Sequence, residues 1–180
     1  MRAFLALALP ETVRRPFEAL QEALPVGRTV QAENLHLTIA FLGEVAEQAI
    51  DELHFALDAA RLPAARVVFD ALAVFGGSLP QSLHAAVKPD PGLSALHARA
   101  CTLARGAGIA LERRRFRPHV TIARFAGRLS PDEESRLARF LGASAATPLP
   151  SFDAAALTLY RSTLTRDGAI HEALADYPLG

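Results

Sequence analysis

The pentapeptide HLTIA at residues 36–40 recurs as HVTIA at residues 119–123. The second copy follows the first by 83 positions, since 119 − 36 = 83. The chain has only 6 histidines, so two His-x-Thr pairs in matching apolar settings are a poor fit to coincidence. Short apolar runs with β-branched residues are typical of buried strands. The repeat therefore predicts two related strands, one from each half of the chain.

Alternation along a strand places the polar residues of each copy together. Successive side chains of a strand point to opposite faces of the sheet. His36 and Thr38 therefore share one face, and the apolar residues between them face the core. The same alternation groups Arg117, His119 and Thr121. Two such strands would form a pseudo-symmetric site with two imidazoles and two hydroxyls.

This set of side chains suits phosphodiester chemistry. In-line displacement at phosphorus needs a base for the nucleophile and an acid for the leaving oxygen, and imidazole can serve as either near neutral pH. Threonine hydroxyls can donate hydrogen bonds to the non-bridging oxygens. A zinc site at His36 and His119 is the alternative, but zinc sites normally use three or four ligands and neither motif supplies more. Because a strained cyclic phosphate needs no metal, we expect neither a metal nor a cofactor.

The remaining histidines and the only cysteine are isolated in the sequence. His54, His84, His97 and His171 are therefore expected to be structural or surface residues. Cys101 lies on an apolar helical stripe and is expected in the core. A lone cysteine excludes a disulfide framework and favours a reducing compartment, which we take to be the cytoplasm.

Composition limits the possible classes further. A chain of 180 residues that is 51% hydrophobic suits one domain, or two small lobes sharing a cleft. The net charge of zero gives no global sign of a polyanionic partner. Four arginines nevertheless crowd into five positions, and guanidinium groups suit phosphate; they are Arg113, Arg114, Arg115 and Arg117. No apolar stretch reaches the roughly 20 residues of a membrane span, so no membrane partner is expected.

Local patterns predict alternating strands and helices. Strands are expected at residues 3–9, 29–31, 34–43, 66–75, 82–88, 116–125, 154–160 and 170–174. Helices are expected at residues 11–24, 46–60 and 91–106, and from a serine cap at residue 130. Pro16 inside the first helix indicates a late start or a kink. The short apolar run at residues 3–9 indicates a buried strand rather than a signal peptide. The order predicts an α+β fold with antiparallel or mixed sheets.

The motif-bearing stretches 33–43 and 116–124 resemble the 2H phosphoesterase superfamily. Within it, the chain is most similar to the bacterial RNA 2′,3′-cyclic phosphodiesterases, also known as 2′-5′ RNA ligases. Residues 2–6, 9–11, 159–162 and 167–169 also fit this pattern. The resemblance thus extends over the whole chain.

The resemblance implies a single bilobal domain over residues 1–180. Two antiparallel or mixed sheets with outer helices would surround a central cleft in pseudo-twofold fashion. The implied reaction opens a 2′,3′-cyclic phosphate at an RNA end to leave a 2′-phosphomonoester, with reverse 2′-5′ ligation as the partner reaction. His36 would be the proton donor and His119 the proton acceptor. Thr38 and Thr121 would bind the phosphate, and a monomer is expected.

Some residues depart from the family pattern. The chain has no tryptophan, although relatives often carry one before the first motif, and His171 stands where tyrosine is common. Arg124 matches the pattern, yet strict alternation turns it away from His119, so we rank Arg117 above Arg124 for phosphate binding. Two alternatives stay open. One is an esterase for small cyclic nucleotides, and the other is a non-catalytic RNA-end-binding protein.

Overall fold

The computed structural model describes residues 1–113, 115–166 and 168–180. Arg114 of the arginine cluster and Asp167 of the family-like C-terminal segment lie outside the described residues. In chain order the elements are β1 (Arg2–Ala8), α1 (Glu11–Ala23), β2 (Arg28–Thr29), the 3₁₀ turn η1 (Ala32–Asn34), β3 (His36–Glu44), α2 (Glu47–Asp58), β4 (Arg66–Val67), β5 (Phe69–Phe75), β6 (Ser82–Val87), α3 (Pro91–Gly106), β7 (His119–Arg124), α4 (Pro131–Ser144), β8 (Phe152–Asp153), β9 (Ala156–Thr165) and β10 (Gly168–Pro178).

A mostly antiparallel sheet joins the two halves of the molecule. Over the described ranges, eight strands follow the order β10-β9-β1-β3-β7-β6-β5, with β2 added beside β7. The two motif strands, β3 and β7, meet at the centre through one registered pair, Leu37 and Val120. These residues occupy equivalent positions of the repeat, because 37 + 83 = 120. The pseudo-twofold axis therefore passes between them.

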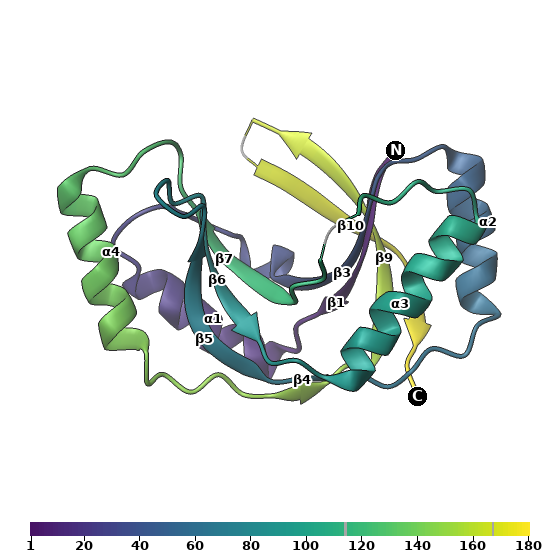
Figure 1. Cartoon of the computed structure of the whole chain (residues 1–180), viewed down its shortest axis with the longest axis horizontal. Coiled ribbons are helices and arrows are strands. Elements are labelled where there is room, and N and C mark those ends of the chain that lie inside the picture. Colours follow the sequence, from purple (N-terminus) through teal and green to yellow (C-terminus); the bar gives the residue numbers. More distant parts are fainter. Residues whose placement is uncertain (114, 167) are drawn as a thin grey trace.

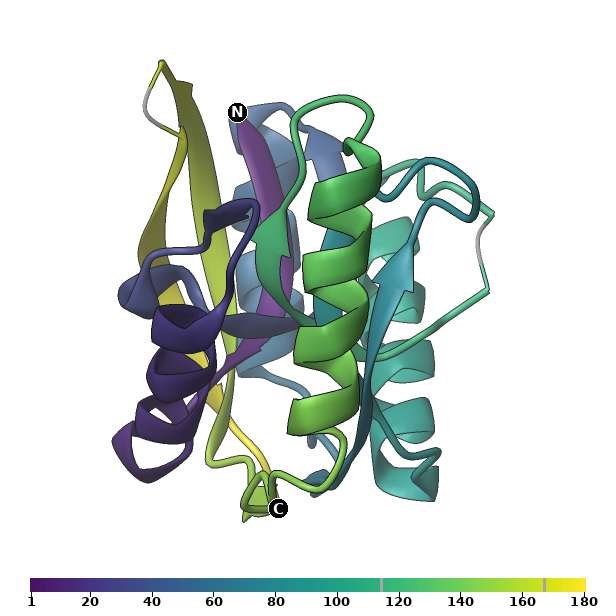
Figure 2. The same ribbon diagram turned by 90° about the vertical axis from the view of Figure 1, so that its left-hand side faces the viewer.

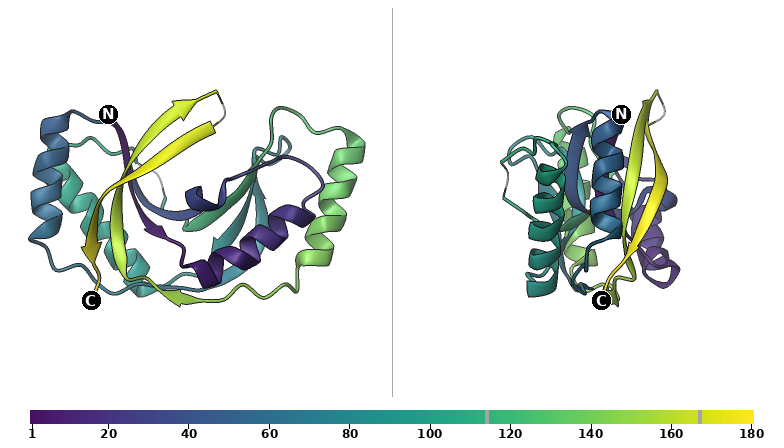
Figure 3. Two further views of the ribbon diagram at one scale, coloured as in Figure 1. Left: turned by 180° about the vertical axis from the view of Figure 1, so that it is seen from behind. Right: turned by 90° about the vertical axis from the view of Figure 1, so that its right-hand side faces the viewer.

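The helices form two groups at opposite ends of the sheet, which gives the bilobal α+β arrangement that the sequence predicts (Figure 1). The helices α2 and α3 pack together, and α3 also contacts β3. At the other end α1 contacts β7 and α4 contacts β5. Figure 2 shows α1 and α4 on one end, and the right panel of Figure 3 shows α2 and α3 on the other. Each lobe contributes one part of the sheet, and the two parts are joined where β3 pairs with β7. The lobes therefore do not form separate layers.

The core is built from apolar residues of both halves. β1 is buried along almost its whole length, with Leu5 and Leu7 fully inaccessible, as expected for the apolar run near the N-terminus. Leu37 and Val120 at the pseudo-twofold axis are equally buried. The buried apolar residues of both lobes form one hydrophobic cluster, so both motif strands pack on the same core.

Both motif strands carry a β-bulge at the same position of the repeat. Ile39 has no partner on β1, because Thr38 pairs with Ala6 and Ala40 with Leu5. In β7 the equivalent Ile122 is skipped in the same way against β6. A bulge adds one residue to one strand and shifts the alternation of side chains beyond it. The burial patterns of the two six-residue segments that begin at each histidine are accordingly identical.

Each bulge leaves a carbonyl that a helix side chain binds. The amide Nε2 of Gln21 on α1 donates to Ile122 O at 3.0 Å. The ring nitrogen Nδ1 of His97 on α3 lies 2.7 Å from Ile39 O and must donate, since a carbonyl only accepts. Buried carbonyls without partners are costly, so these two bonds stabilise the bulged strands. His97 therefore has the structural role that the sequence predicts for it.

The structure corrects some predicted boundaries. The first helix begins at Glu11 and runs through Pro16, so the expected alternative of a late start is wrong. The stretch 66–75 divides into β4 and β5, and β4 pairs with β8 in a small separate sheet. The last two strands are longer than predicted and form a hairpin that extends beyond the rest of the sheet (Figure 1). A turn between these two strands was expected from the sequence, but their full length was not.

Candidate active site

The two motifs open into one cavity of about 290 Å³. Its lining residues come from β2, η1, β3, β7, β10 and the segment after β2: Arg28, Thr29, Val30, Gln31, Asn34, His36, Thr38, His119, Thr121, Arg124, Gly168, Ala169 and His171. The structure thus brings together both predicted histidines and both predicted threonines. They come from the central strands on either side of the pseudo-twofold axis.

The two motif histidines are oriented in the same way. Nδ1 of His36 lies 2.7 Å from the carbonyl of Asn34, and Nδ1 of His119 lies 2.7 Å from the carbonyl of Arg117. A carbonyl only accepts, so each Nδ1 must carry a proton. Each Nε2 is then the nitrogen available for proton exchange with a ligand. The geometry therefore provides two equivalent acid–base nitrogens in one cavity.

The side chains of Arg117 and Arg124 are not oriented as strict alternation along the strand predicts. Arg124 lines the cavity, whereas Arg117 does not. The bulge at Ile122 shifts the alternation, so Arg124 faces the same side as Thr121. Arg117 precedes β7, its side chain is exposed, and its contact with His119 is through the backbone carbonyl. Arg124 is therefore the better candidate for phosphate binding. The expectation that Arg124 turns away from His119 is wrong, because a bulge cannot be seen in one strand.

Two histidines that the sequence presents as isolated lie beside the motif histidines. The ring of His171 on β10 lies 5.1 Å from that of His36, edge to face. The ring of His84 on β6 lies 5.2 Å from that of His119 in a similar arrangement. His84 is buried and does not line the cavity, which agrees with the structural role expected of it, whereas His171 lines the cavity. Their proximity depends on strand pairing, so the only sequence signal was the position of His171, where relatives often have tyrosine.

Aromatic neighbours differ between the two motif histidines. The ring of His36 lies 4.8 Å from Phe4 and 6.3 Å from Tyr160. The ring of His119 lies 4.9 Å from Phe75, and Phe75 stacks on His84 at 3.7 Å. The first motif histidine is thus enclosed by more rings than the second.

Desolvation lowers the pKa of three histidines in or beside the cavity. Desolvation lowers the pKa of His36 to about 4; the carbonyl of Asn34 opposes this, while His171, His119 and Arg124 add to it. Desolvation and the charge of His119 lower the pKa of His84 to about 4. The pKa of His171 is also lowered, first by burial and then by Arg124. In the ligand-free protein His36 is therefore neutral at pH 7.

The other predicted core and surface residues have ordinary structural surroundings. Cys101 is buried on α3, as predicted, and burial raises the pKa of its thiol. His54 on α2 contacts the Tyr177 hydroxyl at 2.9 Å. Within the described ranges, no group of three or more His, Cys, Asp or Glu side chains could hold a metal ion. Nor does any helix among the described residues have the length and apolarity to cross a membrane.

The sequence matches the 2′-5′ RNA ligase superfamily over residues 9–166. The chain belongs to this superfamily. It is 28% identical to the RNA 2′,3′-cyclic phosphodiesterase of Methanocaldococcus jannaschii, with 98% of this chain and 100% of the relative covered. It is 31% identical to the Escherichia coli enzyme of the same name, over 68% of this chain and 71% of the relative.

Solved structures agree with the family assignment. The crystal structure of Escherichia coli LigT in apo form aligns with a TM-score of 0.76 at 26% identity, covering 99% of this chain and 96% of that one. LigT complexed with 3′-AMP aligns with a TM-score of 0.78 at 26% identity, covering 99% and 97%. The predicted 2H phosphoesterase resemblance and the predicted fold class are therefore confirmed.

Proposed function

We propose that this protein is a hydrolase that opens 2′,3′-cyclic phosphates at RNA ends and leaves a 2′-phosphomonoester. The observation that carries the proposal is the pair of histidines with fixed Nδ1 protons, whose Nε2 atoms share one cavity with two threonines. The superfamily relatives named RNA 2′,3′-cyclic phosphodiesterase support the same reaction.

In this mechanism the two imidazoles act on opposite sides of phosphorus. His119 accepts a proton from water through Nε2 as the water oxygen bonds to phosphorus. The bond from phosphorus to O3′ breaks, and His36 donates a proton to O3′ through its own Nε2. Reversal of these steps would join a 5′-hydroxyl RNA through a 2′-5′ bond. No metal or cofactor takes part.

The donor role requires His36 to be protonated when substrate is bound. Burial alone opposes this, because it lowers the pKa of His36 to about 4. A bound phosphate anion offsets the charge of Arg124 and adds negative charge beside Nε2, and both effects raise the pKa of His36. The substrate itself would therefore supply the conditions for acid catalysis.

The remaining polar groups of the cavity would bind the phosphate. Thr38 and Thr121 are placed symmetrically and can donate hydrogen bonds to the two non-bridging oxygens as charge develops. Arg124 adds a positive charge on the same face. Arg117 would contribute through its carbonyl, by holding the Nδ1 proton of His119.

A small cyclic nucleotide is the second candidate substrate. The zero net charge and the cavity of about 290 Å³ favour it, since the volume lies near the lower end for small-molecule sites. The third possibility is an RNA-end-binding protein without turnover. Loss of turnover in His36→Ala and His119→Ala would exclude that role.

Phosphorus NMR of the product from an RNA oligonucleotide with a cyclic phosphate end tests the proposal. We expect a 2′-phosphate, and activity that persists after exhaustive chelation. A 3′-phosphate would reverse the acid and base assignments. Absence of turnover on any cyclic phosphate would overturn the function, and activity that chelation removes and zinc restores would indicate a metal enzyme.

We also propose that residues 1–180 act as one bilobal unit, as a monomer in the cytoplasm. The site needs side chains from both lobes. The single cysteine of the chain, Cys101 on α3, is free, as suits a reducing compartment. Light scattering on a sizing column would show the mass of one chain, and a dimer would contradict this.

A further inference from the structure

The cavity is symmetric at its centre and asymmetric around it. Both members of the histidine pair and of the threonine pair line it. The segment from Arg28 to Gln31 lines it as well, but its described counterparts 83 positions later, residues 111–113, do not. The segment 168–171 has no lining counterpart on the other side either. A substrate with two different ends requires such a difference. The two segments, residues 28–31 and 168–171, form what we call the arm of the cavity. Recognition of the substrate beyond the reacting phosphate would occur in this arm.

Arg28 spans this arm. It lies on β2, paired with Arg124 of β7, and both side chains line the cavity. Its guanidinium Nη2 lies 3.6 Å from the place that a Cβ at Gly168 of β10 would occupy. The guanidinium of Arg28 therefore reaches from the β2 wall of the arm to the β10 wall.

The pairing of two arginines indicates an anionic occupant. Residues directly opposite in an antiparallel ladder have Cα atoms about 4.5–5.5 Å apart, and like charges there are destabilising. The described lining residues include no carboxylate, and neither Arg28 nor Arg124 has an ion pair with a described residue. Arg124 lines the cavity together with both motif histidines, whereas Arg28 lies on the neighbouring strand β2. Two cations on neighbouring strands of one cavity suit two phosphates.

We propose that Arg28 binds a phosphate on the 5′ oxygen of the nucleoside that carries the cyclic phosphate. The ribose would lie between the two groups, with O2′ and O3′ at the histidines and O5′ toward the β2 and β10 walls. This inference rests on the proposed function and gives the substrate class: a nucleoside 2′,3′-cyclic phosphate with a phosphate at its 5′ side. Internucleotide RNA linkages and free 5′-phosphates share this chemistry.

Three substrates separate the possibilities. They are adenosine 2′,3′-cyclic phosphate, the same compound with a 5′-phosphate, and a diadenosine dinucleotide ending in the cyclic phosphate. We expect kcat/KM to be about tenfold higher for the substrates with a 5′-side phosphate, as for one charge-assisted hydrogen-bonded contact. A gain confined to the dinucleotide assigns the site to RNA ends, and a gain confined to the 5′-phosphorylated mononucleotide assigns it to small nucleotides.

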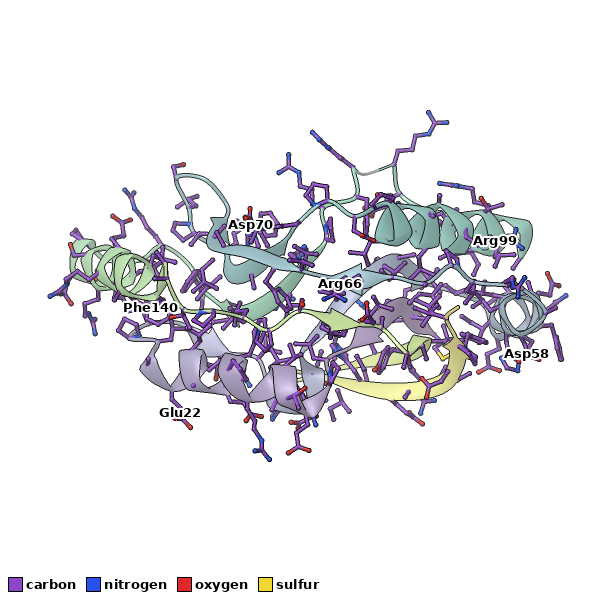
Figure 4. The ribbon with its side chains drawn as sticks, turned by 90° about the horizontal axis from the view of Figure 1, so that it is seen from below. Glu22, Asp58, Arg66, Asp70, Arg99 and Phe140 are labelled. Carbon is purple, nitrogen blue, oxygen red and sulfur yellow. The ribbon has the colours of Figure 1, made fainter. Side chains whose placement is uncertain are left out.

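Variants at Arg28 test whether this residue is responsible. In Arg28→Gln the ratio of kcat/KM between phosphorylated and bare substrates should fall to about one, and Arg28→Lys should keep part of it, because lysine retains the charge but loses the fork. The wild-type ratio should also decrease with salt. Arg99 on α3, an exposed arginine at the end of the molecule opposite Phe140, provides the matched control (Figure 4): Arg99→Gln should keep the full ratio.

Two outcomes would overturn the inference while the proposed function stands. One is a wild-type enzyme that turns over all three substrates with equal kcat/KM. The other is an Arg28→Gln variant whose kcat/KM falls by the same factor for all three, which would mean a structural role. If the wild type turned over none of them, the proposed function would fail, and this inference with it.

Discussion

The two motif strands share a backbone but differ in their surroundings. β3 and β7 have the same bulge, the same burial pattern and the same Nδ1 contact to a carbonyl two residues earlier. Around them the lobes diverge. His36 is enclosed by Phe4, Tyr160 and His171, while His119 adjoins Phe75 and His84. The symmetric part holds the two histidines and two threonines that we propose act on phosphorus, and the asymmetric part is where we propose that the two ends of a substrate are distinguished.

The largest expected effect comes from removing either imidazole. His36→Ala and His119→Ala should each lower kcat by about 10³, since each removes one general acid or base. The control His54→Ala, on α2 outside the cavity, should keep kcat near that of the wild type. Rates on a cyclic-phosphate oligonucleotide provide the measurement.

A modified substrate would then show which of His36 and His119 is the general acid. If sulfur replaces O3′, the leaving group needs no proton, so turnover should return in His36→Ala and not in His119→Ala. Recovery in His119→Ala instead would exchange the two roles.

The threonines should give the next largest effect. Thr38→Val and Thr121→Val remove the hydroxyl with little change of shape, and each should lower kcat by about 10² through loss of one donor to the developing charge. Similar losses in steady-state kcat would show that both halves hold the phosphate. A loss confined to one variant would mean that the non-bridging oxygens are bound from one lobe only.

The pH dependence of stability compares two histidines of lowered pKa, one from each lobe. The pKa of His36 and of His84 falls from 6.5 to about 4 on folding. The unfolded chain therefore binds protons that the folded protein refuses, and stability is lost as pH falls from 6.5 toward 4, by at most about 1.4 kcal/mol per pH unit for each group. Urea denaturation at several pH values in this range measures the free energy of unfolding. This free energy should change less steeply with pH in His36→Gln and in His84→Gln than in the wild type. An unchanged pH dependence in His36→Gln would mean that folding does not lower the pKa of His36.

The smallest effect concerns the bonds to the bulge carbonyls. Gln21→Leu and His97→Leu should each lower the free energy of unfolding by about 1–3 kcal/mol, because each leaves a carbonyl of a motif strand without its side-chain donor. Val30 N still donates to Ile122 O, but Gln21→Leu also removes the 2.6 Å bond from Gln21 Nε2 to Val30 O, so the two losses should be similar. Urea denaturation measures both, with the exposed Gln48→Leu as control. If only one of the two variants lost stability, the two side chains would not support the bulges equally.

The sequence by itself determined the centre of the site. Alternation within a strand is a local property, so His36 with Thr38 and His119 with Thr121 could be assigned to the cavity face from the pattern alone. The repeat spacing likewise located the two strands, and the helix at residues 91–106 was predicted with its observed bounds.

Only the tertiary structure decided what surrounds that centre. A bulge is a mismatch between two strands, so the turn of Arg124 toward the cavity depends on β6 as much as on β7. His84 and His171 reach the motif histidines through strands from elsewhere in the chain. Arg28 joins the site because β2 pairs with β7 across nearly a hundred residues of sequence. The alternation of side chains between the two faces of a strand is fixed by the covalent chain. Register and strand order depend instead on packing between distant segments, so they cannot be predicted from one strand alone.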